Sequence, residues 1–320
     1  MANARKPLDT AFKQQRLPAW QPLLTPRCII VTFVVTGVVF IVVGCVVLSV
    51  DSKVVEITLD YPADCALGSV CQLTATIPSD MVPPVYFYYQ IDGMYQNHRR
   101  YVKSRNDNQL AGKPVSFSAL HTSCDPATTF AVGGTQKFVY PCGLIAASLF
   151  NDVISAKVDN VPLAGDAWNS TNIIWSTDLQ KFKSSSFYET SDFTHQTLLD
   201  NKPVSLPPVT DPDFIVWMRT AGLPKFRKLY RVKMDKATMK ANSVLEITVA
   251  NNYDVASFGA TKSIVVSTTS ALGGKNPFLA WAYIIVGAIC VAFGAMLGVK
   301  FLFYPRKPGD LSYWEKNHVH

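Results

Sequence analysis

Two long apolar runs constrain this chain more than any other feature of its 320 residues. The first runs from Cys28 to Val50 and contains no charged residue. The second begins at Phe278, stays uncharged to Leu297 and continues past Lys300. A helix rises about 1.5 Å per residue, so each run is long enough to cross a hydrocarbon core of about 30 Å. The sequence therefore predicts two transmembrane helices, at 28–50 and 278–303.

A cleaved signal peptide is the alternative interpretation of the first run. The run is about twice as long as the apolar part of such a peptide, and a polar tail, residues 1–27, precedes it. We therefore expect it to remain as a membrane helix.

The positive charge of the chain is distributed unevenly. The net charge is +7, with 48% hydrophobic and only 17% charged residues, a composition that excludes a disordered chain. The tail 1–27 has five basic residues and one acidic residue, whereas the segment 51–277 has 21 basic and 20 acidic residues. Because positive residues flank membrane helices on the cytosolic side, both termini (1–27 and 304–320) are predicted to be cytosolic. The segment 51–277 is then lumenal or extracellular, where no nucleic-acid partner is expected.

The cysteines agree with that placement. Three of the seven lie in the apolar runs, and the other four lie in the segment 51–277: Cys65, Cys71, Cys124 and Cys142. Four cysteines allow three pairings, and we favour Cys65–Cys71 and Cys124–Cys142 because they close short loops. Their spacing matches neither a zinc ribbon nor a CxxC redox site. Asn169-Ser170-Thr171 is the one N-glycosylation sequon that we expect to be used.

Short runs of alternating apolar and polar residues predict a β-rich domain between the helices. They are Val54–Leu59, Cys71–Ile77, Gln136–Tyr140, Phe214–Thr220, Val244–Val249 and Ile264–Thr268. Proline and glycine separate them, which favours an antiparallel, sandwich-like fold. Two stretches are predicted to be helical instead, Gly143–Val153 and Pro224–Lys233. The basic segment His98–Arg105 is predicted to be a solvated hairpin.

Motifs for enzymatic chemistry are missing from the sequence. There is no phosphate-binding GxxxxGK[ST] loop, no HExxH helix and no GxSxG turn. The histidines and acidic residues form no metal-ligand pattern, and neither apolar run has an acidic residue. We therefore expect no catalytic residue, no metal and no cofactor. A thiol ectoenzyme that uses Cys124 and His121 remains one alternative.

Glycines are spaced along one side of each apolar run. Gly37 and Gly44 lie in the first, and Gly287, Gly294 and Gly298 lie in the second. Such small residues let helices pack closely. They could pair the two helices with each other or bind a second membrane protein.

Five stretches of this sequence resemble the cell-division-cycle-fifty/Lem family, the accessory β-subunits of phospholipid flippases (type IV P-type ATPases). They are TAFKQQRLPAWQPLL (10–24), YQNHRRYVKSRNDNQLAG (95–112), PCGLIAASLFND (141–152), DFIVWMRTAGLPKFRKLYR (213–231) and GGKNPFLAWAYIIVG (273–287). They occur in the family's order and cover about a quarter of the chain. The sequence departs from the family at Val153, which removes a sequon that members often have, and it lacks an extra cysteine pair near Cys65–Cys71 that some members have.

The resemblance implies a heterodimer with the catalytic α-subunit of a type IV P-type ATPase in contact with membrane lipids. That subunit would carry the nucleotide site and the lipid path. This chain would be needed for its folding, its exit from the endoplasmic reticulum and its transport of phospholipid to the cytosolic leaflet. The expected locations are the endoplasmic reticulum, Golgi or endosomes, or the plasma membrane. Expected partner contacts are Phe12, Arg16 and Trp20 in the tail and Gly287, Gly294 and Gly298 in the second helix.

A two-span ligand-gated cation channel subunit is the alternative from another class. It would share the two helices and the large disulfide-bonded domain between them. Such channels usually carry ten or more cysteines in that domain, against four here, and the resembling stretches are not theirs.

Overall fold

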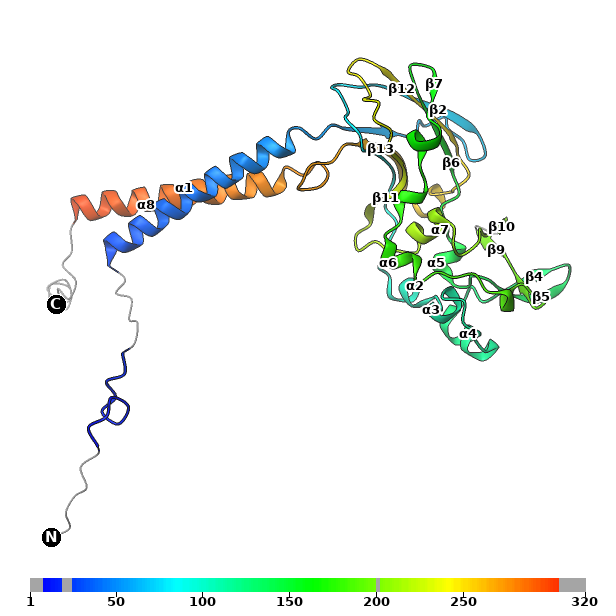
Figure 1. Cartoon of the computed structure of the whole chain (residues 1–320), viewed down its shortest axis with the longest axis horizontal. Coiled ribbons are helices and arrows are strands. Elements are labelled where there is room, and N and C mark those ends of the chain that lie inside the picture. Colours follow the sequence, from blue (N-terminus) through cyan, green and yellow to red (C-terminus); the bar gives the residue numbers. More distant parts are fainter. Residues whose placement is uncertain (1–7, 19–24, 200–201, 305–320) are drawn as a thin grey trace, which may run out of the picture. The chain divides into compact units, whose positions relative to one another are not determined.

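Two apolar helices of 26 residues lie side by side in the computed structural model, which describes residues 8–18, 25–199 and 202–304 (Figure 1). They are α1 (Pro26–Asp51) and α8 (Phe278–Phe303), and both are long and apolar enough to cross a membrane. The chain divides into two compact units, one containing these helices and the other comprising residues 50–275. We call α1 and α8 the helix pair, and residues 50–275 the β domain.

Two four-stranded antiparallel sheets form the main part of the β domain. The first has the order β1-β13-β3-β11, with bounds Glu56–Asp60, Thr261–Ser267, Val85–Asp92 and Lys225–Lys233. The second has the order β2-β12-β6-β7, with bounds Val70–Thr76, Val244–Ala250, Val153–Val158 and Val161–Pro162. Side chains from both sheets, such as Phe87 and Ile247, join one hydrophobic core. The expected β-rich, antiparallel, sandwich-like fold between two helices is confirmed.

Smaller elements complete the β domain. A three-stranded sheet has the order β4-β5-β8, with bounds Thr129–Val132, Thr135–Val139 and Phe193–Thr194, and β9 (Gln196–Leu199) pairs with β10 (Lys202–Ser205). The short helices are α2 (Arg99–Lys103), α3 (Asp107–Leu110), α4 (Phe117–Cys124), α5 (Leu144–Ala147), α6 (Ser176–Leu179) and α7 (Pro212–Trp217). Among the described residues, the 3₁₀ turns are η1 (Gly165–Trp168), η2 (Thr171–Ile173), η3 (Ser186–Tyr188) and η4 (Ala256–Phe258).

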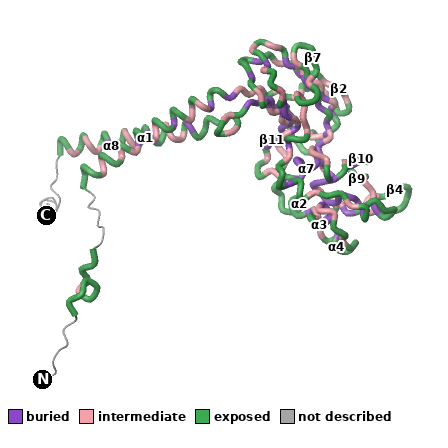
Figure 2. Tube along the Cα trace, viewed as in Figure 1, coloured by how far each residue is buried: buried purple, intermediate pink, exposed green. Residues whose placement is uncertain are grey.

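Burial differs between the two units along the chain (Figure 2). Most positions of the helix pair are exposed or half-buried, whereas the β domain holds nearly all of the fully buried side chains. Its largest buried side chain is Trp217, whose indole N–H donates to the carbonyl of Ile145 at 2.7 Å. This bond joins α7 to α5 inside the core.

Two predicted elements have the opposite type in the structure. Pro224–Lys233, predicted as a helix, is mostly strand β11, because alternate residues such as Phe226 and Tyr230 are buried and the strand pairs with β3. Phe214–Thr220, predicted as a strand, begins within α7. The Asp211 carboxylate accepts from the N–H of Phe214 at 3.0 Å and caps this helix, and Pro212 fits its first turn.

Two further predictions were wrong in extent or type. Of the helix predicted at Gly143–Val153, only α5 is helical, and Val153 already begins β6. The segment His98–Arg105 contains α2 rather than a hairpin.

The chain turns into α5 at Gly143, where φ is +106° and an added Cβ would lie 2.2 Å from the carbonyl oxygen of Ser104. Only glycine fits there.

Candidate functional site

Glycines form the contact line of the helix pair. An added Cβ at Gly37 would lie 2.7 Å from the carbonyl oxygen of Gly287, and one at Gly287 would lie 2.7 Å from that of Gly37. Gly44 faces Ile284 and Ala280 in the same way, with the nearest atom at 2.7 Å. The two backbones are thus in direct contact, which only small residues allow.

Aromatic side chains flank this contact line. Phe33 packs on Phe293 with ring centroids 5.2 Å apart, and Phe40 meets Tyr283 edge-on at 5.3 Å. These rings fill the space beside the glycines and fix the register of α1 on α8.

The glycines expected to bind a partner therefore have different surroundings. Gly287 and Gly294 both face α1, Gly294 with Val34 2.9 Å from an added Cβ. Gly298 has nothing within 4 Å of such an atom and leaves open space on α8. Within this chain, the first two glycines take part in pairing the helices, and whether any of the three binds a partner stays a prediction.

The outer faces of the helix pair are apolar and exposed. On α1 the exposed side chains include Val31, Val35, Val38, Val42 and Val46, and on α8 they include Trp281, Ile285, Ile289, Met296 and Val299. Such rows would be unfavourable in water and suit a hydrocarbon environment or an apolar partner.

The N-terminal tail, residues 1–27, is described only in part. Residues 10–15 form a short turn, in which the N–H of Gln14 donates to the carbonyl of Thr10 at 2.9 Å. The Phe12 side chain is 76% exposed, and Arg16 lies 4.0 Å from Asp9 on the surface. Trp20 lies outside the described residues.

Two disulfides join the cysteines that the sequence analysis favoured. Cys65 is bonded to Cys71 and closes the loop before β2, and Cys124 at the end of α4 is bonded to Cys142 before α5. The ectoenzyme alternative needs a free Cys124 thiol, and here that sulfur is bonded. His121 packs against Phe138 with ring centroids 5.1 Å apart. No group of metal-ligating residues occurs among the residues that the structure describes.

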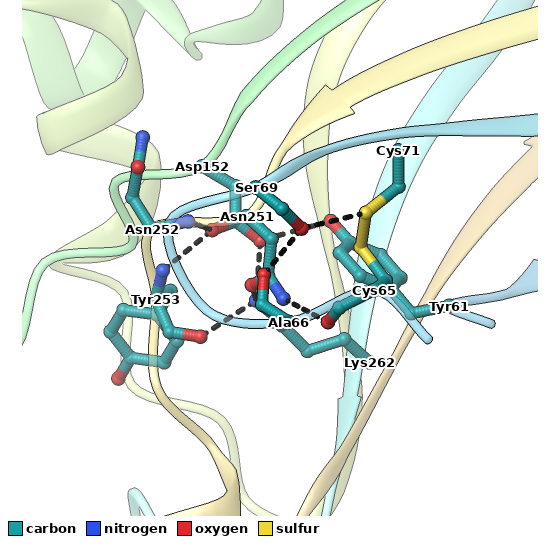
Figure 3. The surroundings of a disulfide bond; sticks show 10 residues. All are labelled: Tyr61, Cys65, Ala66, Ser69, Cys71, Asp152, Asn251, Asn252, Tyr253 and Lys262. Carbon is teal, nitrogen blue, oxygen red and sulfur yellow. Dashed lines mark hydrogen bonds and ion pairs between the residues drawn. A yellow bond between two sulfur atoms is a disulfide. The ribbon is translucent and has the colours of Figure 1, made fainter. Parts of the chain in front are cut away.

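A buried ion pair lies beside the first disulfide (Figure 3). The Lys262 ammonium donates to the Asp152 carboxylate at 2.6 Å, to the Asn251 side-chain oxygen at 2.5 Å and to the Tyr253 carbonyl at 2.6 Å. The Lys262 side chain is 4% exposed and that of Asp152 is 0% exposed. Burial lowers the pKa of Lys262, and the nearby Asp152 opposes this effect.

Further bonds saturate this carboxylate. Asp152 accepts from the backbone N–H groups of Asn252 and Tyr253, both at 2.6 Å, and from the Tyr61 hydroxyl at 2.9 Å. Burial, followed by the charge of Asp152, raises the pKa of Tyr61 well above its usual value. With four donors fixed around it, the carboxylate ties both sheets and the loop after β12 together, and its role is structural.

A second buried lysine holds the end of α7. Lys228 on β11 donates to the carbonyls of Val216 at 3.3 Å and Trp217 at 2.8 Å, and to that of Arg219. Burial, with a smaller effect from the Arg219 charge, lowers the pKa of Lys228 to about 7. Its three acceptors are all carbonyl oxygens, at the helix end where such groups lack partners.

The predicted glycosylation site lies where η1 meets η2. Asn169 pairs with Val232 through two backbone bonds of 3.0 Å, and its side-chain oxygen accepts from the N–H and the hydroxyl of Thr171, both at 2.8 Å. Asn169 is half-buried, and its neighbours Thr171 and Asn172 are exposed. Glycosylation of this residue stays a prediction.

Sequence reasoning missed the buried lysines. Lys262 and Asp152 are 110 residues apart. Asp152 ends one of the stretches that resemble the family, but Lys262 lies in none of them, so nothing in the sequence joined the two. Lys228 lies in the resembling stretch 213–231, but its burial could be inferred only from the alternation of buried and exposed residues in β11, which the helical interpretation hid.

Comparison with known proteins gives consistent matches along the chain. Residues 48–307 match the LEM3 (ligand-effect modulator 3) family / CDC50 family. ALA-interacting subunit 3 of Arabidopsis thaliana is 38% identical, over 98% of this chain and 92% of its own length. Cell cycle control protein 50A of Bos taurus is 37% identical, over 92% and 89%. The phospholipid-transporting ATPase accessory subunit LEM3 of Saccharomyces cerevisiae is 31% identical, over 96% and 86%.

Proposed function

The chain belongs to the LEM3/CDC50 family, and on that premise we propose that it is the accessory subunit of a phospholipid-transporting P-type ATPase. The observation that carries the proposal is the match of almost the whole chain to a yeast relative that is named as such a subunit. The match covers both the helix pair and the β domain, so we assign the function to the two units together. The partner ATPase supplies the catalytic residues, and this chain supplies none.

The helix pair and the β domain suit this role in different ways. The helix pair presents exposed apolar faces on both helices, and Gly298 leaves room on α8 for another helix to approach. The β domain is held by two disulfides and by the buried Asp152–Lys262 pair, which keep its surface loops in one arrangement. A partner that binds only the native ATPase stabilises it by mass action. Folding of the ATPase and its exit from the endoplasmic reticulum then depend on this chain.

The membrane orientation is part of the proposal. Both termini lie in the cytosol, and the β domain is lumenal or extracellular, in the endoplasmic reticulum, the Golgi or endosomes, or at the plasma membrane. The excess of positive charge at the two ends of the chain supports this orientation. The two disulfides also support it, because disulfides persist in oxidising compartments and are rare in the cytosol.

The cytosolic tail forms a third contact. Phe12, Arg16 and Trp20 bind the cytosolic face of the ATPase. The exposed Phe12 ring and the weakly held Arg16 guanidinium support this contact, because both are free to bind another surface. Aromatic and arginine side chains contribute most of the binding energy in many interfaces.

Co-purification from native membranes tests the proposal. The tagged full-length chain is expected to recover a P-type ATPase, and depletion of the chain is expected to retain that ATPase in the endoplasmic reticulum and abolish its phospholipid transport. An ATPase that reaches its membrane and transports lipid normally without this chain would overturn the proposal.

The tail contact has its own matched variants. Phe12→Ala/Arg16→Ala is expected to lower recovery of the ATPase, whereas Lys13→Ala, in the same turn, should leave recovery unchanged. Equal recovery with all variants would remove the tail from the interface and leave the other two contacts.

A further inference from the structure

A hollow of about 800 Å³ opens on the β domain between α3, the segment after α6 and the segment after α7. Its charged lining is mainly basic: Arg105, Lys113, Lys181, Lys183 and Arg219. Only two acidic residues, Asp107 and Asp178, line it as well. The proposed role as an accessory subunit does not require this hollow, and no motif in the sequence predicted it.

The hollow concentrates positive charge that the rest of the β domain lacks. Its five basic and two acidic residues leave a net charge of +3, whereas the whole segment 51–277 has 21 basic and 20 acidic residues, a net charge of +1. The remainder of the segment is therefore net negative. A concave basic site within such a surface raises the local concentration of anions.

Contacts with neighbouring side chains and a carbonyl group hold two arginines of the hollow in place. The Arg219 guanidinium lies 4.0 Å from the centre of the Trp175 ring and pairs with Asp178. Arg105 pairs with Asp107 at 2.9 Å and reaches the carbonyl of Met218 at 3.5 Å. A guanidinium has five N–H donors, so each arginine retains donors for a further acceptor.

Asp178 anchors the basic groups rather than cancelling them. It binds both Arg219 and Lys181, the latter at 3.0 Å, and its side chain is 10% exposed. Burial opposes its ionisation, yet the bonds from Lys181 and Arg219 lower the pKa of Asp178. One carboxylate therefore holds two cations at the hollow.

Two lysines at the hollow are not paired. Lys113 and Lys183 are exposed, and neither forms an ion pair with an acidic side chain among the described residues. Their segments are joined, because the N–H of Lys183 donates to the carbonyl of Leu110 at 2.8 Å. Gly112 permits this approach: its φ is +73°, and an added Cβ would lie 2.8 Å from the carbonyl oxygen of Lys183.

We propose that this hollow binds a phosphate group. Fixed arginines and unpaired lysines together match the charge and the several acceptor oxygens of phosphate. Arg105 and Arg219 donate to the phosphate oxygens in fixed directions, and Lys113 and Lys183 close on it as mobile charges. The phosphate is either the diester of a phospholipid headgroup or free inorganic phosphate, and the two share this chemistry.

Calorimetric titration of the purified full-length chain in a neutral detergent tests the site, with separate probes for the two sources. One titration uses inorganic phosphate and the other uses glycerophosphoserine, a headgroup diester without acyl chains, both at matched ionic strength. Saturable binding of one probe per chain is expected, and it should weaken as salt is raised. Stronger binding of glycerophosphoserine would assign the site to lipid headgroups, and stronger binding of inorganic phosphate would assign it to the free ion.

Charge-reversal variants locate the binding. Lys113→Glu/Lys183→Glu is expected to weaken binding about tenfold or more. Lys157→Glu/Lys236→Glu makes the same charge change at exposed lysines outside the hollow and should leave binding within about twofold. Circular dichroism checks that both variants are folded. Absence of saturable binding for both probes, or equal weakening in the two variants, would overturn the proposal.

Discussion

Different kinds of contact stabilise the helix pair and the β domain, each within itself. In the helix pair the closest contacts occur where side chains are missing, at Gly37 and Gly287. In the β domain they occur where large or charged side chains are buried, as at Tyr89 and Phe150, whose rings stack at 3.9 Å, and at the Asp152–Lys262 pair. The two units therefore differ in which substitutions they tolerate.

The environment explains this difference. In a hydrocarbon phase, burial of an apolar side chain gains little, so helices associate through close backbone packing. In water, burial of apolar surface is the main driving force, and every buried charge then needs partners. Adding a methyl group should be the damaging change in the helix pair, and removing a partner should be the damaging change in the β domain.

Removal of the buried carboxylate is expected to have the largest effect. Asp152→Ala leaves the Lys262 ammonium buried without its counter-charge and also removes the acceptor of two backbone N–H groups. We expect a loss of about 3–5 kcal/mol in the free energy of unfolding. Denaturant unfolding of the full-length chain in detergent, monitored by the circular dichroism of the β domain, measures this loss in the free energy of unfolding.

Two controls accompany that measurement. Asp152→Ala/Lys262→Met removes both charges and is expected to be more stable than Asp152→Ala alone. Asp92→Ala breaks the exposed pair with Lys225, whose atoms lie 3.3 Å apart, and should change stability by less than about 1 kcal/mol. If Asp92→Ala and Asp152→Ala were equally destabilising, burial would not be the cause.

A larger side chain on the contact line is expected to separate the helix pair. Gly37→Leu places a Cβ 2.7 Å from the carbonyl oxygen of Gly287, and overpacking of this kind costs about 1–3 kcal/mol. Cross-linking measures the effect, with Phe33→Cys and Phe293→Cys as the reporter pair in a background without the three helix cysteines. The cross-link should form in the reporter chain and be lost with Gly37→Leu.

The same substitution where space is open is the control. Gly298→Leu has nothing within 4 Å of its added Cβ and should leave the cross-link intact. The cross-link is detected after cleavage at a protease site inserted after Lys236. Because both native disulfides lie on the N-terminal side of the cut, only the cross-link between positions 33 and 293 can keep the two fragments joined. Equal loss in both variants would mean that helix stability, rather than the contact line, is affected.

The helix pair could be predicted from the sequence more completely than the β domain. Membrane helices carry their signal within one continuous run, so the bounds of α1 and α8 were expected to within two residues. Strands β1, β2, β5, β12 and β13 were expected because each alternates on its own. Strand β3 shows little alternation of residue type, because every position from Val85 to Tyr89 is apolar or aromatic, although buried and half-buried positions alternate there.

The remaining features depend on contacts between distant segments. The run that became β11 has apolar residues that suit either a helix or a strand, and its pairing with β3 decides the outcome. The Asp152–Lys262 pair and the basic hollow each join segments from different parts of the chain, so no local spacing encodes them. The family, by contrast, could be recognised because it is encoded in contiguous blocks.

The second buried lysine is expected to give a smaller, pH-dependent effect. The pKa of Lys228 is about 7 in the folded chain, against the ordinary value of 10.5 expected when unfolded. Between these values the unfolded chain binds one more proton than the folded chain, so stability rises with pH above about 7. Below about pH 7 both states are protonated, so Lys228 no longer makes stability depend on pH.

Unfolding of the full-length chain at pH 7, 8 and 9 tests this expectation. One proton corresponds to at most about 1.4 kcal/mol per pH unit, so the free energy of unfolding should rise by up to that amount between pH 8 and pH 9. Lys228→Met removes the titrating group, so the slope attributable to it should disappear, although the carbonyls of Val216 and Trp217 lose their donor. An exposed lysine, Lys157, serves as the control, and Lys157→Met should keep the slope of the unmodified chain. If Lys228→Met and the unmodified chain showed the same slope, Lys228 would be protonated throughout, held by its three carbonyl acceptors.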